Sequence, residues 1–280
     1  MMDESLKNTS LGKHTEFVDE YDPQQLYAIP RKVSREGLGI TEPLPFEGED
    51  IWNAYELSWL DAEGKPQVAI AEVRVPASSP YLVESKSFKL YLNSFANTRF
   101  DTWDAVAATI KQDISATAEA TATVLLLPLD EAAMLPKWNA QGVCLDTLPL
   151  LQAADEDGPV GKPWLELDAE RKGEVSETFY SHLLRSLCPV TGQPDWAMLE
   201  ISYRGAPISA QHLLQYLVSF RQQTGFHERI VEQTFMDISA VLKPEELLVS
   251  ARFTRRGGLD INPYRSSTTV EVANLREIRQ

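Results

Sequence analysis

Tyr91-Leu92-Asn93-Ser94-Phe95 recurs almost unchanged later in the chain as Tyr216-Leu217-Val218-Ser219-Phe220. A second match follows in the same order, where Ile110-Lys111-Gln112-Asp113-Ile114 corresponds to Thr234-Phe235-Met236-Asp237-Ile238. Matches that keep their order along the chain indicate an internal duplication. We therefore expect two related halves.

The pattern around each match predicts strands followed by a pair of helices. In the first half, strands are expected at 55–60 and 67–75 around a turn at 61–66. Helices follow at 88–95 and 102–116, the second capped by Thr102 or Asp101, before a strand at 122–129. The second half repeats this order, with a strand at 197–204, helices at 210–221 and 227–242, and a strand at 246–254.

These elements predict an α+β fold in which antiparallel sheets carry their helices on one face. The polar, aperiodic residues 1–45 are interpreted as an extended arm. The first half then covers residues 46–150 and the second half covers residues 151–280. Because the residues with candidate catalytic or binding chemistry are not duplicated, we expect each half to supply a different part of one site.

The composition is that of an ordinary globular protein. The 280 residues are 43% hydrophobic and 24% charged, with a formal net charge of −15. That charge argues against a large nucleic-acid surface, which needs a basic face. No apolar run is long enough for a membrane span, and the N-terminus lacks the pattern of a signal peptide. Two cysteines make no disulfide framework, so we expect a cytoplasmic protein.

The segment from Ser186 to Trp196 (Ser-Leu-Cys-Pro-Val-Thr-Gly-Gln-Pro-Asp-Trp) carries the most chemistry. Pro189 disfavours helix at Cys188, and the Gly and Pro residues that follow predict a compact loop. Such a loop would return the Asp195 carboxyl group toward the Cys188 thiol. A thiolate nucleophile with a nearby acid suits covalent catalysis. The alternative is that Cys188 only packs in the core, as most cysteines do.

Three further segments contain candidate binding residues. Glu84-Ser85-Lys86-Ser87-Phe88-Lys89 opens a helix, where Ser85 or Ser87 could be the cap and two lysines could bind a phosphate or form a solvated face. Phe226-His227-Glu228 begins another helix, whereas His182 and His212 are interpreted as ordinary helical residues. Arg255-Arg256-Gly257-Gly258 combines phosphate-binding arginines with glycines that permit close approach. Neither a Rossmann fingerprint nor a P-loop occurs.

Together these segments resemble the NADPH-dependent 7-cyano-7-deazaguanine reductases, the nitrile reductases of queuosine biosynthesis. The resemblance rests on Glu-Ser-Lys-Ser-Phe-Lys at 84–89, Cys-Pro-Val-Thr-x-Gln-Pro-Asp at 188–195, Phe-His-Glu at 226–228 and Arg-Arg-Gly-Gly-Leu-Asp-Ile-Asn-Pro at 255–263. It covers nearly the whole chain and best fits the long, two-half form of that family. It implies the tunnelling fold (T-fold), with two tandem ββααββ units, and a homodimer.

The resemblance also implies roles for individual residues. Cys188 would be the nucleophile and Asp195 the proton donor, with His227 as a further catalytic group. The deazaguanine pocket would be formed by Val83, Glu84, Ser85, His227 and Glu228. NADPH would contact Ser85, Lys86, Arg256 and Gly257. Two NADPH would be consumed for each nitrile reduced, no metal would be needed, and the partner would be a small deazapurine rather than a nucleic acid or a membrane.

Two other functions remain open from the residues alone. A zinc-dependent cyclohydrolase of the same fold would need about three Cys or His ligands. Cys188 and His227 could supply two, and Cys144 has no evident partner in the sequence. A non-catalytic purine-binding module would retain the fold without consuming NADPH. A metal assay and a Cys188→Ala variant separate these possibilities.

Overall fold

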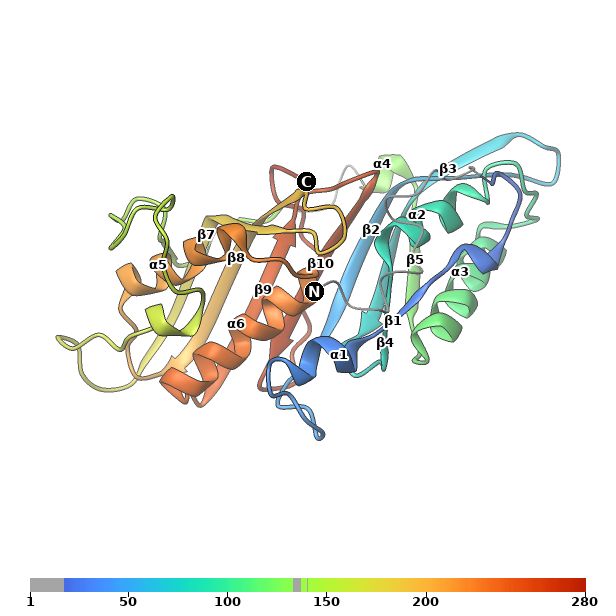
Figure 1. The fold of residues 1–280 in the computed structure, drawn as a ribbon. Coiled ribbons are helices and arrows are strands. Elements are labelled where there is room, and N and C mark those ends of the chain that lie inside the picture. The colour runs from blue at the N-terminus through green and yellow to red at the C-terminus, as the bar shows by residue number, and fades with distance from the viewer. Residues whose placement is uncertain (1–17, 133–136, 140) are drawn as a thin grey trace. The chain divides into compact units, whose positions relative to one another are not determined.

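The computed structural model describes residues 18–132, 137–139 and 141–280 (Figure 1). The chain divides into two compact units. Of the described residues, unit 1 contains 18–37, 49–132 and 255–261, and unit 2 contains 38–48, 137–139, 141–254 and 262–280. The predicted halves, 46–150 and 151–280, are divided differently from these units. Residues 46–48, 137–139 and 141–150 were placed in the first half and belong to unit 2, and residues 255–261 were placed in the second half and belong to unit 1.

Unit 1 contains three strands that pair antiparallel in the order β5–β3–β2. Its strands are β2 (Glu47–Leu60), β3 (Pro66–Pro76) and β5 (Thr123–Leu127), and its main helices are α2 (Ser85–Asn93) and α3 (Trp103–Ala118). Alternate residues of β3 are buried, while α3 buries Val106, Ile110, Ile114 and Ala118 at a spacing of four. One stripe of the helix therefore packs against one face of the sheet.

Shorter elements complete unit 1. They are the 3₁₀ turn η2 (Pro23–Gln25), β1 (Ala28–Pro30), α1 (Arg31–Glu36), β4 (Tyr81–Val83) and α4 (Leu129–Ala132). Strand β1 pairs antiparallel with β4, which leads directly into α2. Residues 18–37, expected to be part of an extended arm, thus contain secondary structure, and residues 1–17 lie outside the described part.

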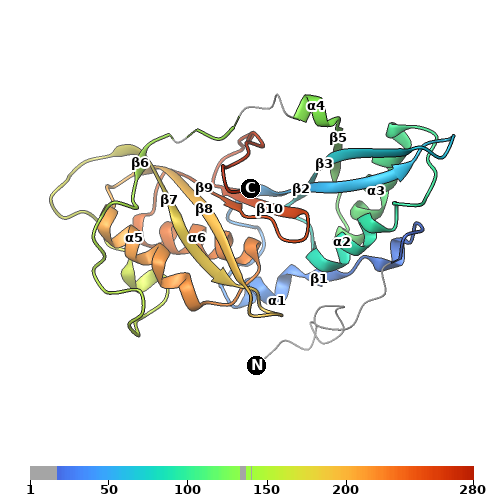
Figure 2. The ribbon, with the colours of Figure 1, turned by 90° about the horizontal axis from the view of Figure 1, so that it is seen from above.

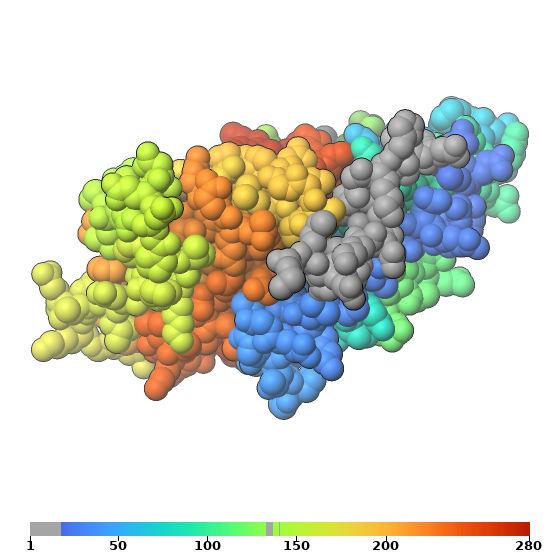
Figure 3. Space-filling view, viewed as in Figure 1, coloured from blue at the N-terminus to red at the C-terminus, as the bar shows by residue number. Residues whose placement is uncertain are grey.

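Unit 2 contains a sheet in the order β10–β9–β8–β7–β6. Its strands are β6 (Val143–Cys144), β7 (Val175–Leu187), β8 (Pro194–Gly205), β9 (Glu246–Phe253) and β10 (Leu259–Ser266), the last of which begins in unit 1. The helical elements are α5 (Ala210–Ser219), α6 (His227–Leu242), η3 (Lys162–Trp164) and η4 (Phe220–Gln222). Helices α5 and α6 cover one face of the sheet, whose strands are seen from another direction in Figure 2. The segment before β7, yellow-green in Figure 3, lies over α5.

The two units repeat the same contacts at the matched sequences. The Tyr91 hydroxyl donates to Asp113 Oδ2 at 2.6 Å, and the Tyr216 hydroxyl donates to Asp237 Oδ2 at 3.1 Å. In each unit this bond joins the two helices of the pair. The recurring serine is also explained, because the Ser94 hydroxyl donates to the carbonyl of Tyr91 and the Ser219 hydroxyl to that of Tyr216. The recurring residues hold each helix pair together.

The two units also share an irregularity in their strand pairing, which supports the internal duplication. The β2–β3 pairing shifts register between Ala54 and Leu57, and the β7–β8 pairing shifts between Ser181 and Leu184. Each shift inserts one extra residue into the first strand of its hairpin, which is a β-bulge. Each begins at the residue six positions before that strand's end. The structure therefore confirms the α+β class with antiparallel sheets.

Some local predictions were wrong. Asp195 lies in strand β8 rather than in a loop, and His182 lies in strand β7 rather than in a helix. The bulge at Ser181 to Leu184 interrupts the alternation that would have marked β7 as a strand. Strand β10 was missed because Asp260, Asn262 and Pro263 belong to residue types that are depleted in strands.

Candidate functional site

In unit 2, Cys188 is the first residue of a tight hairpin loop between β7 and β8. Its backbone N–H donates to the carbonyl of Gln193 at 2.9 Å, and its carbonyl accepts from Gly192 N–H at 3.0 Å. Gly192 has a φ of 67°, a conformation in which glycine avoids the strain of a side chain. The predicted compact loop is therefore present, and both Cys188 and Asp195 are 5% exposed.

The loop that precedes α6 is hydrogen-bonded to the end of β7, beside Cys188. Leu187 N–H donates to the carbonyl of Gln223 at 2.8 Å, and Gly225 N–H donates to the carbonyl of Leu187 at 3.0 Å. This backbone ladder fixes the start of α6 next to the hairpin that carries Cys188. The first residue of α6 is His227. Two sequence-predicted segments, far apart in the chain, thus meet in one unit.

His227 contacts Asp195 directly. The distance from His227 Nε2 to Asp195 Oδ2 is 3.4 Å, and the two side chains are 11% and 4% exposed. The imidazole also stacks on Phe253 of β9, with ring centres 3.8 Å apart and planes 7° from parallel. His227 Nδ1 is buried and has no hydrogen-bond partner among the described residues. The ring is therefore held by stacking and by Asp195, with one nitrogen able to bind a ligand.

Glu228 follows His227 in the first turn of α6 and is 4% exposed. The cap residue, Phe226, supplies no side-chain hydrogen bond to the helix. An acidic group in the first turn is stabilised by the positive end of the helix dipole. The N-terminus of α6 therefore presents an imidazole and a carboxyl group side by side in sequence.

In unit 1, Glu84 is the N-cap of α2. Its carboxylate accepts from Lys86 N–H and Ser87 N–H, both at 2.8 Å. The prediction that Ser85 or Ser87 caps the helix was wrong, because the Ser87 hydroxyl instead donates to the carbonyl of Glu84 at 2.7 Å. Burial raises the pKa of Glu84, and the two backbone donors oppose that rise.

Val83 is buried at the end of β4, immediately before the Glu84 cap. Ser85 and Lys86 occupy the first two positions of α2 and are partly exposed. Glu84 and two of the four residues predicted to contact the cofactor, Ser85 and Lys86, are therefore consecutive at one helix end. A helix N-terminus with a neighbouring lysine attracts anions.

The Arg256–Gly257 segment forms the turn before β10. Arg256 and Leu259 exchange two backbone hydrogen bonds, at 2.8 and 3.2 Å, around a two-residue turn. Gly257 and Gly258 have φ values of 60° and 81°, as a type I′ turn requires. A side chain at Gly257 would also approach Lys89 Nζ to 2.9 Å. The glycines thus let the turn lie against α2 within unit 1.

Lys89 and its neighbours line a cavity of about 40 Å³ at this turn. The Lys89 ammonium lies 3.7 Å from Glu56 Oε2, and the Arg255 guanidinium lies over the Tyr55 ring at 4.6 Å. The turn therefore has the Lys89 side chain against Gly257 and the Glu56 carboxylate against Gly258. The structure brings Lys89 to this place, whereas the sequence showed only that it follows Lys86 by three residues.

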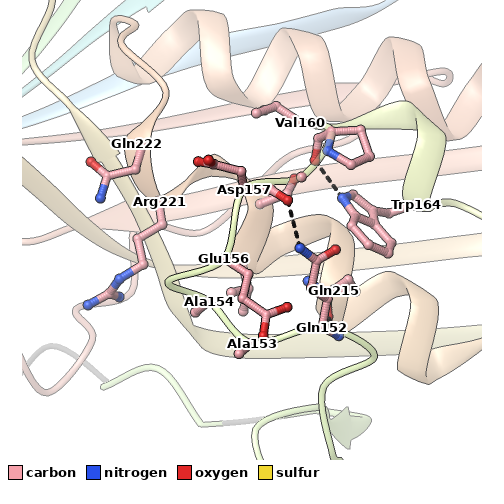
Figure 4. Close-up of a pocket in the computed structure, with 14 residues that line it drawn as sticks. Gln152, Ala153, Ala154, Glu156, Asp157, Val160, Trp164, Gln215, Arg221 and Gln222 are labelled. Atoms are coloured by element: carbon pink, nitrogen blue, oxygen red, sulfur yellow. Dashed lines mark hydrogen bonds between the residues drawn. The ribbon is translucent and has the colours of Figure 1, made fainter.

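A larger cavity, of about 130 Å³, lies between α5 and the segment before β7 in unit 2 (Figure 4). Gln215 holds its rim by accepting from Leu151 N–H and Gln152 N–H at 2.9 and 3.0 Å. Its lining contains none of the sequence-predicted site residues, and it includes the carboxylates Glu156 and Asp157.

No group of three His, Cys, Asp or Glu side chains suited to hold a metal ion occurs in residues 18–132, 137–139 and 141–280. Over the same described ranges, no helix is long and apolar enough to cross a membrane. Cys144 is partly exposed in β6, and Cys188 is buried; both are thiols rather than partners in a disulfide.

The chain matches two family models. Residues 17–126 match "Nitrile reductase, 7-cyano-7-deazaguanine-reductase N-term", and residues 194–271 match "QueF-like protein". The matches fall in different halves and together cover more than half of the sequence. A solved structure, an archaeosine synthase QueF-Like in the apo form, aligns with 36% of this chain and 99% of its own length, at 18% identity and a TM-score of 0.31.

Curated relatives match over nearly the full length. An NADPH-dependent 7-cyano-7-deazaguanine reductase from Burkholderia lata is 51% identical over 98% of this chain and 99% of its own. The enzyme of the same name from Dechloromonas aromatica is 52% identical over 96% of this chain and 94% of its own. Identity of this extent over both halves shows common ancestry along the whole sequence. The chain therefore belongs to the 7-cyano-7-deazaguanine reductase family and is an oxidoreductase.

Proposed function

We propose that this protein reduces the nitrile 7-cyano-7-deazaguanine to the amine 7-aminomethyl-7-deazaguanine, with NADPH as the source of hydride. The observation that carries the proposal is the hairpin thiol of Cys188 in the same unit as the buried Asp195–His227 pair. Family membership supports the substrate and the cofactor, because the relatives are named for both. The product would enter the queuosine pathway of tRNA modification.

The chemistry requires a nucleophile because an unactivated nitrile accepts hydride slowly, whereas a thioimide is a better hydride acceptor. The Cys188 thiolate would add to the nitrile carbon while Asp195 gives a proton to the nitrogen, which forms a thioimide. A hydride from NADPH would reduce the thioimide carbon, and cleavage of the C–S bond would leave an imine and regenerate the thiolate. A second hydride and a further proton would give the amine. Two NADPH are therefore oxidised for each nitrile.

The remaining site residues would bind the two substrates. Glu84 and Glu228 would accept hydrogen bonds from the ring N–H and exocyclic amine of the deazaguanine, since both groups are donors. His227 would bind the same ligand through Nδ1, which has no hydrogen-bond partner among the described residues, and would steady Asp195 through Nε2. Val83 and Ser85 would line the pocket.

NADPH would contact Ser85 and Lys86 at the start of α2, and Arg256 and Gly257 at the turn. We also propose that the two units are tandem ββααββ units of the tunnelling fold, that the protein is a cytoplasmic homodimer, and that it needs neither a metal nor a nucleic acid. The common bulge and the matching Tyr–Asp bonds of the two units support the duplication.

Intact-protein mass spectrometry tests the covalent step. Mixing the protein with 7-cyano-7-deazaguanine in the absence of NADPH should add one substrate mass. Cys188→Ala should show no adduct, whereas Cys144→Ala, which removes the other thiol, should react like the parent. NADPH absorbance should fall when all three components are present. An equal adduct on Cys188→Ala, or no adduct on the parent, would reject the thioimide.

The two rival functions make different predictions in the same experiments. A zinc-dependent cyclohydrolase would contain stoichiometric zinc and would not oxidise NADPH. A non-catalytic purine-binding module would bind the deazaguanine equally well before and after Cys188→Ala. No contact among the described residues of the site specifically favours either rival function.

A further inference from the structure

Ser186 is a buried hydroxyl without a partner, two residues before Cys188. It is 0% exposed, and its Oγ makes no hydrogen bond to any described residue. Three other buried side-chain atoms without a hydrogen-bond partner among the described residues belong to the end of β7 or to the segment that leads into α6. They are Arg185 Nε, Gln223 Oε1 and His227 Nδ1. A polar atom left unpaired in the interior is costly. The concentration of such atoms at the end of β7 and the start of α6 indicates a polar function there.

The strand register places Ser186 directly opposite Asp195. The two residues are Cα partners in the antiparallel pairing of β7 with β8. Directly opposite residues extend their side chains from the same face, with Cβ atoms about 4.5–5.5 Å apart. Rotation about χ1 is therefore enough to aim the Ser186 hydroxyl at the Asp195 carboxyl group. The Asp195 side chain is 4% exposed and meets His227 Nε2 at 3.4 Å through Oδ2.

We infer that Ser186 is a positioning residue for Asp195, whose hydroxyl donates a hydrogen bond to the carboxylate that forms when Asp195 releases its proton. The inference rests on the proposed function, in which Asp195 is the acid. Ser186 keeps its own proton throughout, and the proton that reaches the nitrile nitrogen comes from Asp195. Hydrogen bonds to a charged acceptor are stronger than those to a neutral one. The interaction therefore grows as the reaction proceeds, which favours the transition state over the ground state.

Removing the hydroxyl should slow the chemical step without weakening substrate binding. Ser186→Ala should lower kcat by roughly 10- to 150-fold, the equivalent of about 1.5–3 kcal/mol for a hydrogen bond to a charged group. The KM values for nitrile and NADPH should change little. Ser181→Ala is the matched control, because Ser181 lies in the same strand, is equally buried, and instead donates to Asp146 Oδ1 at 2.6 Å. That variant should keep its kcat.

The pH profile gives a readout that a space-filling role would not move. Without its donor the Asp195 carboxylate is less stable, so the fall in rate at high pH should shift to higher pH in Ser186→Ala. Every variant compared keeps both His227, which contacts Asp195 from α6, and Cys188 in the same hairpin. An unchanged kcat and an unchanged profile in Ser186→Ala would overturn the inference.

A double-mutant cycle in thermal unfolding separates this inference from the proposed function. Ser186→Ala and Asp195→Asn should be coupled in stability at high pH, where the carboxylate is charged, and much less at low pH. An active parent without this coupling would overturn the role of Ser186. A coupled pair in a parent that oxidises no NADPH with the nitrile would support the Ser186–Asp195 contact and would reject the proposed reaction.

Discussion

Glu84 has two separable roles, since its carboxylate caps α2 and, by our proposal, also binds the substrate. Replacing it with alanine removes the two carboxylate oxygens that accept hydrogen bonds from Lys86 N–H and Ser87 N–H, each at 2.8 Å. Loss of an N-cap costs about 0.5–2 kcal/mol, and a buried N–H left unpaired costs about 1–3 kcal/mol. Because the buried carboxylate also carries a desolvation penalty, we expect a net loss of about 2 kcal/mol for Glu84→Ala.

A loss of that size should lower the Tm by about 4–8 °C, given about 2–4 °C for each kcal/mol in domains of 150–250 residues. Thermal unfolding followed by circular dichroism measures this shift, and calorimetric titration with 7-cyano-7-deazaguanine measures binding. Thr102→Ala is the matched control, because it removes the N-cap of α3 in the same unit. It should lower the Tm by a smaller amount and leave substrate affinity unchanged.

The two measurements can refute the reasoning separately. An unchanged Tm in Glu84→Ala would show that the carboxylate does not hold the start of α2. A lowered Tm with unchanged substrate affinity would leave the cap in place and remove Glu84 from the deazaguanine pocket. Parallel losses of affinity in Glu84→Ala and Thr102→Ala would mean that weakened folding, rather than a lost contact, lowers binding.

Asp195→Asn should slow turnover by about 10²–10⁴-fold, the range for general acid–base groups, and a rate equal to the parent's in steady-state NADPH oxidation would remove it from the mechanism. Arg256→Ala and Lys86→Ala should each raise the KM for NADPH roughly 10- to 100-fold, because a charge-assisted phosphate contact contributes about 1.5–3 kcal/mol. The KM for NADH should change far less, and equal effects on both KM values would place the 2′-phosphate site elsewhere. Burial raises the pKa of Glu200, so its contribution to stability falls as pH rises, and Glu200→Gln should gain Tm relative to the parent between pH 4 and pH 8. Hydrogen bonding to Arg171 lowers the pKa of Glu177, so its contribution to stability is lost as pH falls. The Tm of Glu177→Gln should therefore fall relative to the parent as pH rises, and a trend of the same sign as that of Glu200→Gln would refute these pKa directions.

The sequence by itself determined the duplication, the α+β class, four of the six α-helices and five of the ten strands in the described residues. The β3 alternation and the four-residue spacing in α3 are local patterns, so a single stretch of sequence is enough to identify them. Helix α6 was predicted with the bounds at which it is observed, His227 to Leu242. The matching of Tyr91 with Tyr216 also came from sequence alone, although its physical reason, a bond to the second helix of each pair, did not.

Tertiary structure decided which atoms of the candidate site meet within each unit. The sequence identified Asp195 and His227 as candidates, but their 3.4 Å contact depends on the pairing of β7 with both β8 and the loop before α6. Likewise, Lys89 reaches Gly257 only because the β10 turn lies against α2. Ser186 carried no sequence signal, since its interest arises from strand register and from the absence of a partner among the described residues. The sequence shows which chemical groups are present. Which of them meet depends on strand pairing, which is set by bulges and long-range hydrogen bonds that no local pattern encodes.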